Sequence, residues 1–213
     1  MINIGNTFIL GDSYSTFEGF IPQGYKAYYT TAEKEETDVN QVEQTWWHQL
    51  LAETDATLLK NCSYSGTTIC NTGYDGKDSK GVSFVARFDK LLAENYFYEN
   101  KINTFFLFGG TNDSWANSPI GELMYSDWEK EDLFSVLPAF CYLIHKICIN
   151  LPDAKVFCVL NTELKSDIRE NFKTACKRYD VNVIQLDEFD KKCGHPTVKG
   201  MKQIKEQIME YIK

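Results

Sequence analysis

Short apolar runs alternate with longer amphipathic segments along most of the chain. The runs predict strands over residues 7–10, 57–60, 103–108, 155–160 and 182–186. The amphipathic segments predict helices over residues 44–53, 83–98, 132–150, 166–179 and 196–212. In the last of these, Val198, Met201 and Ile204 begin an apolar face with spacings of three and four, and Pro196 is expected in the first turn, where its missing N–H costs nothing.

This order of strands and helices predicts an α/β fold, a three-layer α/β/α sandwich around a five-stranded parallel sheet. Right-handed crossovers would place helices on both faces of the sheet, and ligands would gather at the carboxyl ends of the strands. The 213 residues contain no repeat, low-complexity tract or Gly/Pro/Ser-rich linker, so residues 1–213 are expected to form a single domain.

Composition and charge narrow the functional classes. A net charge of −8 argues against a nucleic-acid partner, which needs a basic surface. No apolar run approaches the roughly 20 residues of a membrane-spanning helix, so no membrane span is expected. The chain has no HExxH, P-loop or GxGxxG motif, and we expect neither a metal nor an organic cofactor.

The cysteines and the first residues bear on location. Seven cysteines without a CxxC pair predict buried, reduced thiols rather than a disulfide framework or a zinc site. The start MINIGNTFIL lacks the features of a secretory signal. Both observations favour a cytoplasmic protein, whereas a signal trimmed from the chain would allow export.

Candidate chemistry begins at FILGDS, where a predicted buried strand ends and Ser13 follows. A serine hydroxyl is a poor nucleophile unless a neighbouring base removes its proton. His48 and His145 lie within helical patterns, where packed or surface histidines are common. His195 instead follows the last predicted strand, so it belongs to the same edge of the sheet as Ser13.

Two further strand ends offer hydrogen-bond donors. NCSYSGTT follows the second strand, and Gly66 could bring its N–H close to a substrate because it lacks a Cβ. FLFGGTND ends the third strand, and Asn112 could offer its side-chain amide. Each fragment alone is ordinary turn chemistry. Their occurrence together with Ser13 and His195 indicates an active site for acyl transfer.

The segments GDSYS, SYSGTT, GGTND and GHPT resemble, in order, the four sequence blocks of the SGNH (GDSL-type) hydrolases. The resemblance extends from residue 11 to residue 200 and implies a flavodoxin-like fold and serine-dependent hydrolysis of esters or thioesters. It implies that Ser13 is the nucleophile and His195 the general base. The oxyanion hole would consist of the N–H groups of Ser13 and Gly66 and the Asn112 amide, and the Asp12 carboxylate would hold the turn that presents Ser13.

One position departs from the family pattern. The family usually carries an aspartate three residues before the catalytic histidine, and here that position is Lys192. Asp190 could orient His195 if the loop bulges, and Asp187 is a poorer candidate because its side chain lies nearer the sheet. A Ser–His dyad, oriented by a backbone carbonyl, is the third alternative.

Fewer residues in the sequence point to the substrate. Trp115 and Asn117 follow the Asn112 block and could flank the pocket, although Trp115 could equally cap the core. Between residues 18 and 43 lies a connection too long for an ordinary loop, and its tyrosines, including Tyr25, would suit stacking on a sugar ring or packing beside Ser13. We expect a small-molecule or glycan ester as substrate, as for a carbohydrate acetylesterase.

Two competing interpretations remain open. A catalytically silent glycan-binding or interaction protein could keep this fold, and Lys192 in place of the usual aspartate favours it. A flavodoxin-like nucleotide binder would share the fold, but the chain lacks the phosphate loop that such a protein needs.

Overall fold

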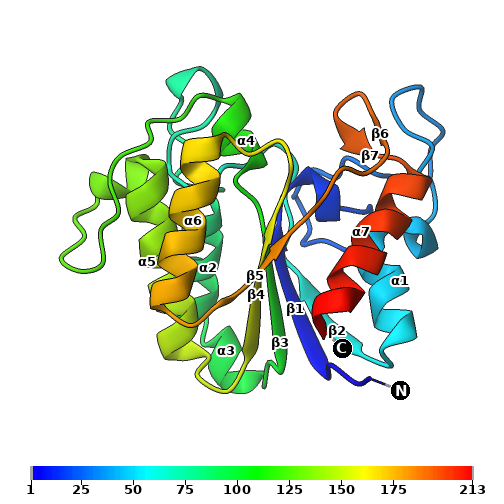
Figure 1. Ribbon diagram of the computed structural model, residues 1–213, viewed down its shortest axis with the longest axis horizontal. Coiled ribbons are helices and arrows are strands. Elements are labelled where there is room, and N and C mark those ends of the chain that lie inside the picture. The colour runs from blue at the N-terminus through cyan, green and yellow to red at the C-terminus, as the bar shows by residue number, and fades with distance from the viewer. Residues whose placement is uncertain (1, 213) are drawn as a thin grey trace.

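A five-stranded parallel sheet forms the centre of the computed structural model, which describes residues 2–212. Its order is β2-β1-β3-β4-β5, the flavodoxin-like arrangement with a switch point between β1 and β3. Helices cover both faces of the sheet (Figure 1), so the predicted three-layer α/β/α sandwich is confirmed. The strands are Asn6–Gly11, Thr57–Asn61, Thr104–Phe108, Lys155–Leu160 and Asn182–Gln185, numbered β1 to β5.

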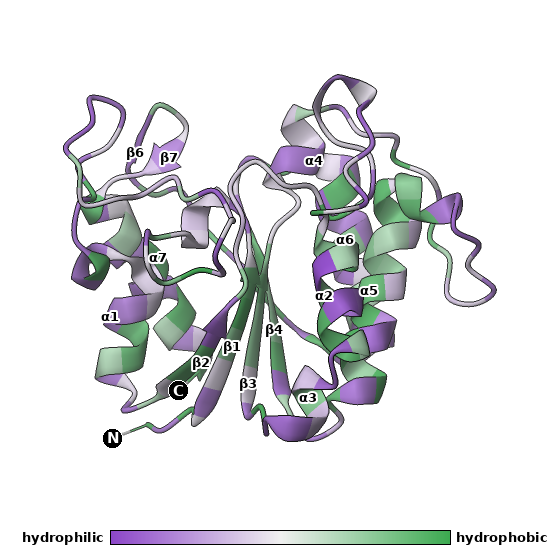
Figure 2. Cartoon of the chain, turned by 180° about the vertical axis from the view of Figure 1, so that it is seen from behind, coloured by the Kyte–Doolittle hydropathy of each residue, from purple (hydrophilic) through white to green (hydrophobic). Residues whose placement is uncertain are grey.

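The central strands are apolar on both sides because both sides are covered. All five residues of β3, TFFLF, are buried, as is typical of parallel sheets between two helical layers. Successive side chains point to opposite faces, so Phe105 and Phe106 belong to two different core clusters. Figure 2 shows the same pattern, with the middle of the sheet coloured hydrophobic along most of its length.

The helices divide unequally between the two faces. On one face lie α1 (Trp46–Glu53) and α7 (Val198–Ile212), which pack against each other. The other face carries α2 (Phe84–Ala93), α5 (Val136–Asn150) and α6 (Ser166–Arg178). The predicted apolar face of α7 is confirmed, since Met201, Ile204 and Ile208 are fully buried.

Two predicted helices are shorter in the structure. The helix expected over residues 83–98 is interrupted at Asn95, whose φ of 55° ends α2 before the short α3 (Tyr96–Glu99). The helix expected from residue 132 begins only at Val136, because Ser135 is extended and separates it from a 3-10 turn, Asp132–Phe134.

The segment before α7 differs most from expectation. Pro196 does not lie in the first turn of α7 but in β7 (His195–Pro196), which pairs antiparallel with β6 (Lys191–Lys192). The two residues between these strands, Cys193 and Gly194, have φ values of 50° and 76°. Two consecutive residues with positive φ form the tight hairpin turn that matches the twist of short antiparallel strands.

A five-residue helix, α4 (Thr111–Trp115), was also not predicted.

The remaining general expectations concern cysteines and membranes. All seven cysteines are free, and five of them are buried. Among residues 2–212 no helix combines the length and the apolar character needed to cross a membrane.

Gly109 tests how tightly the end of β3 is packed. A Cβ at this position would lie 2.4 Å from the buried Phe84 ring, so we expect Gly109→Ala to cost about 1–3 kcal/mol in the free energy of unfolding. Urea denaturation measures this cost. The matched control is Gly81→Ala, where no atom lies within 4 Å of the new Cβ. Equal stability of the two variants would contradict this packing.

Candidate active site

Four loops that are distant in sequence meet at the carboxyl edge of the sheet. The 3-10 turn Ser13–Ser15 follows β1, the loop with Gly66 follows β2, and α4 with Asn112 follows β3. The β6–β7 hairpin with His195 comes after β5. Figure 1 shows α4 and this hairpin at the same end of the sheet, on either side of the strand ends.

Ser13 is held by its neighbours in the turn. The Asp12 carboxylate accepts a hydrogen bond from the Tyr14 N–H at 3.1 Å, as expected for a group that holds this turn. The Thr16 hydroxyl donates to the Ser13 carbonyl at 3.0 Å. Asp12 is almost fully buried, and this burial raises its pKa to about 7. Ser13 itself is only 3% exposed.

His195 lies within hydrogen-bonding distance of Ser13. Its Nε2 is 3.0 Å from Ser13 Oγ, and its Nδ1 is 3.1 Å from the carbonyl oxygen of Cys193. One tautomer satisfies both contacts, with Nδ1–H donating to the carbonyl and Nε2 accepting from the serine hydroxyl. Burial lowers the pKa of His195, while the bond to the Cys193 carbonyl acts in the opposite direction. The ring is therefore neutral near pH 7 and can accept a proton.

No carboxylate orients this imidazole in the described part of the chain. The carboxylate of Asp190 accepts a hydrogen bond from the Thr197 hydroxyl, and the Asp190 N–H bonds to Gln203 Oε1 at 2.8 Å. These contacts turn Asp190 toward the start of α7, and the structure therefore does not support the expectation that it orients His195. Asp187 is likewise tied to α7, through its N–H to Gln207. The geometry is that of the third alternative, a serine and a histidine with a backbone carbonyl.

Asn112 offers an unused donor. Its Nδ2 is buried and has no hydrogen-bond partner among residues 2–212, while its Oδ1 accepts a hydrogen bond from the Tyr74 hydroxyl at 2.7 Å. This bond fixes which end of the amide is free. A buried donor without a partner is costly, and a ligand oxygen beside it would remove that cost.

Two buried ionisable residues hold the loop that carries Gly66. The Arg87 guanidinium donates to the Gly11 carbonyl at 3.2 Å, to Thr67 Oγ1 at 3.0 Å and to the Cys62 carbonyl, linking this loop to the end of β1. The Asp113 carboxylate accepts from two N–H groups of the same loop, at 2.9–3.2 Å.

Gly66 itself has a φ of 78°, which favours glycine, and open space where a Cβ would lie. Arg87 was not among the predicted site residues, although it interrupts the apolar run SFVARF.

The three candidate substrate residues lie in different surroundings. The Trp115 ring is 6.0 Å from the His195 ring and close to Gly194. Asn117 is exposed, and its Oδ1 accepts from Lys165 Nζ, so its side chain is engaged elsewhere. Tyr25 stacks on Tyr64, with 4.6 Å between the rings, and lines a cavity of about 550 Å³ formed by its own loop. Only Trp115 lies beside the histidine.

Tyr28, rather than Tyr25, contacts the base. Its ring is stacked on His195 with 3.6 Å between the ring centres and an angle of 6° between the planes. The Tyr14 ring lies 5.4 Å from the same imidazole. Spacing along the chain could not separate Tyr28 from the other tyrosines of this loop.

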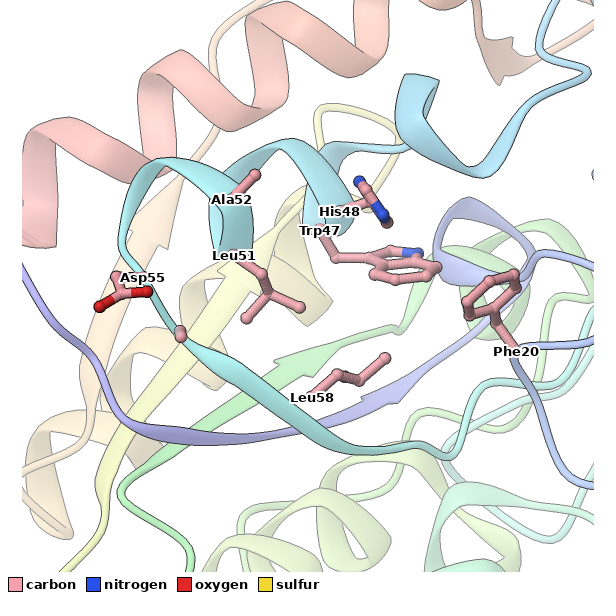
Figure 3. Close-up of a pocket in the computed structure, with 8 residues that line it drawn as sticks. Phe20, Trp47, His48, Leu51, Ala52, Asp55 and Leu58 are labelled. Atoms are coloured by element: carbon pink, nitrogen blue, oxygen red, sulfur yellow. The ribbon is translucent and has the colours of Figure 1, made fainter.

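Other hollows lie away from these residues. A cavity of about 390 Å³ between α1 and the following strand is lined by Phe20, Trp47, His48 and Leu58 (Figure 3), and it contains neither Ser13 nor His195. Within residues 2–212, no group of three His, Cys, Asp or Glu side chains could hold a metal ion.

Known proteins share this fold and much of the sequence. A protein from Bacteroides ovatus ATCC 8483, described as a GDSL-like lipase, is 41% identical; the match covers 100% of this chain and 98% of that one, with a TM-score of 0.91. A protein from Bacteroides uniformis ATCC 8492 with the same description is 40% identical over 97% and 94% of the two chains, with a TM-score of 0.90.

More distant structures share the fold alone. An acetyl xylan esterase from Butyrivibrio proteoclasticus is 14% identical, with a TM-score of 0.62 and coverage of 100% of this chain and 64% of that one. No curated protein sequence matches the chain. The model of the GDSL-like lipase/acylhydrolase family matches residues 6–212. The chain therefore belongs to the GDSL-like lipase/acylhydrolase family of ester hydrolases.

Proposed function

We propose that this protein is a serine esterase that cleaves carboxylic esters by two-step acyl transfer. The observation that carries the proposal is the 3.0 Å contact between Ser13 Oγ and His195 Nε2. A serine hydroxyl needs an adjacent base to attack a carbonyl, and a neutral imidazole at hydrogen-bonding distance supplies one.

In the first step His195 Nε2 takes the proton of Ser13 as Oγ attacks the ester carbon. The carbonyl π electrons move to its oxygen, and a tetrahedral oxyanion forms. The Cys193 carbonyl accepts the Nδ1–H bond throughout, which stabilises the positive charge on the ring. The imidazolium then gives its proton to the leaving alcohol as the ester C–O bond breaks, and an acyl-Ser13 intermediate remains.

The oxyanion needs donors that are fixed in place before it forms. The free Nδ2 of Asn112 is one such group, because Tyr74 holds the other end of the amide. The N–H groups of Ser13 and Gly66 complete the proposed oxyanion hole. In the second step His195 removes a proton from water, which attacks the acyl carbon, and the acid leaves as Ser13 regains its proton.

We propose a small acyl group on a carbohydrate as the substrate. The proposal draws on solved structures of the same fold that are described as an acetyl xylan esterase and as family two carbohydrate esterases. The aromatic ring of Trp115 beside the base would suit contact with a sugar ring. A second candidate, a silent glycan-binding protein, is favoured by the absence of a carboxylate on His195 among residues 2–212.

Ser13→Ala distinguishes the two candidates. We expect the wild type to hydrolyse p-nitrophenyl acetate and to be labelled by a fluorophosphonate, and the variant to lose both, since no nucleophile remains. Ser126→Ala, at an exposed loop position, is the control and should behave as wild type. Absence of turnover and labelling in the wild type would favour the binding protein.

Asn112→Ala removes one proposed oxyanion donor. We expect kcat for p-nitrophenyl acetate to fall roughly 10²–10³-fold, because the negative charge of the intermediate loses a preorganised N–H. Asn150→Ala, at the exposed end of α5, is the matched control. Thermal unfolding should show that both variants fold. An unchanged kcat in Asn112→Ala would remove this residue from the mechanism.

The pH dependence follows from the histidine. Only neutral His195 can accept the Ser13 proton, so kcat/KM should fall as pH decreases through the pKa of His195. Because burial lowers that pKa, the midpoint of the acid limb is expected below 6.5. A profile of kcat/KM between pH 4.5 and 8 measures it. A midpoint above 7 would contradict the assignment of His195 as a buried, neutral base.

A further inference from the structure

Among the aromatic rings around His195, the Tyr28 ring lies at the shortest distance, and no step of the proposed acyl transfer involves it. The planes of the two rings are nearly parallel and the ring centres are 3.6 Å apart, which leaves no room for water between them. The imidazole has one other polar anchor besides Ser13, the Cys193 carbonyl at 3.1 Å. The hydrogen bonds at Nδ1 and Nε2 act at the edge of the ring, whereas the Tyr28 contact acts on its face.

The backbone of Tyr28 is tied to the nucleophile turn. Its N–H donates to Thr16 Oγ1 at 2.9 Å, and the same hydroxyl donates to the Ser13 carbonyl at 3.0 Å. The next residue, Tyr29, is fully buried, and its hydroxyl donates to the Pro196 carbonyl at 3.0 Å. Residues 28 and 29 therefore connect the Ser13 turn to the hairpin that carries His195.

A third tyrosine reinforces this connection. The Tyr14 hydroxyl donates to the Gly194 carbonyl at 2.6 Å, so the residue after the nucleophile is also bonded to the hairpin. These bonds set the distance between the two loops. The face of the imidazole itself is covered by the Tyr28 ring.

We infer that Tyr28 is a positioning residue, whose ring face holds the His195 imidazole in the plane that aims Nε2 at Ser13 Oγ. This inference rests on the proposed esterase function. Stacking on one face and the Cys193 carbonyl at Nδ1 together supply the orientation that a carboxylate provides elsewhere. The face of the ring and not its hydroxyl is the effective part, because no hydrogen bond joins the Tyr28 hydroxyl to another of residues 2–212.

Three variants test the inference with p-nitrophenyl acetate. Tyr28→Leu removes the flat face, and we expect kcat to fall roughly 10- to 100-fold with KM unchanged, since misorientation of a catalytic group impairs the chemical step. Tyr28→Phe keeps the face and should retain wild-type kcat. Phe20→Leu changes an aromatic residue of the same loop that is 44% exposed, and it serves as the control.

The same substitution in a His195→Ala background separates positioning from other roles. If Tyr28 acts through the imidazole, Tyr28→Leu should cause no further loss of activity once the imidazole is absent. An equal loss in both backgrounds would overturn the inference. So would a raised KM with unchanged kcat, which would make Tyr28 a substrate contact, or a Tyr28→Phe variant as impaired as Tyr28→Leu.

Thermal unfolding shows whether each variant folds, and Ser13→Ala separates the role of Tyr28 from the esterase mechanism. If Tyr28→Leu does not fold, Tyr28→Met replaces it as a second variant without a ring, and the same outcomes apply. Full kcat in a ringless variant, together with inactive Ser13→Ala, overturns the role of Tyr28 and leaves the esterase intact. Activity retained in Ser13→Ala would instead overturn the esterase mechanism itself.

Discussion

The site depends on one constraint, which is that backbone polar groups buried at the carboxyl edge of the sheet must find partners inside the protein. In this chain, side chains of one loop supply hydrogen bonds to backbone groups of another loop. Buried Arg87 donates to carbonyls at the end of β1 and just after β2. Asp113 accepts N–H groups of the loop after β2, and Tyr14 and Tyr29 donate to the hairpin carbonyls. Each of these bonds also fixes one loop against another, so the same contacts that stabilise the fold define the positions of Ser13, Asn112 and His195.

One buried side-chain donor without a partner among the described residues lies at the site itself. Asn112 Nδ2 is buried and unpaired although its own Oδ1 is bonded to Tyr74. A structural asparagine would gain stability from a second bond, whereas a donor kept for an oxyanion has to stay free until the substrate arrives. The cost of the unpaired amide is the kind of local conflict that proteins retain at functional sites.

The histidine illustrates how a short element can replace a charged side chain. The β6–β7 hairpin turns on Cys193 and Gly194, both with positive φ, and this turn directs the Cys193 carbonyl at Nδ1. A carbonyl is a neutral acceptor, so it stabilises the imidazolium less than a carboxylate would. The aromatic surroundings formed by Tyr28, Trp115 and Tyr14 restrict the ring instead.

The sequence alone determined the five strands and the layer order, and it predicted that Ser13, Gly66, Asn112 and His195 follow strand ends at one edge of the sheet. Hydrophobic periodicity is a local property of the sequence. That the carboxyl ends of parallel strands lie at one edge of the sheet follows from the topology, so neither prediction requires a structure. Only the tertiary structure decided that Asp190 bonds to Thr197, that Pro196 belongs to a hairpin and that Tyr28 covers His195. These outcomes depend on side-chain direction and on backbone turns of two residues. A shift of one residue in such a turn exchanges one hydrogen-bond or stacking partner for another. The pattern of apolar positions does not change with such a shift, so it cannot predict the partner.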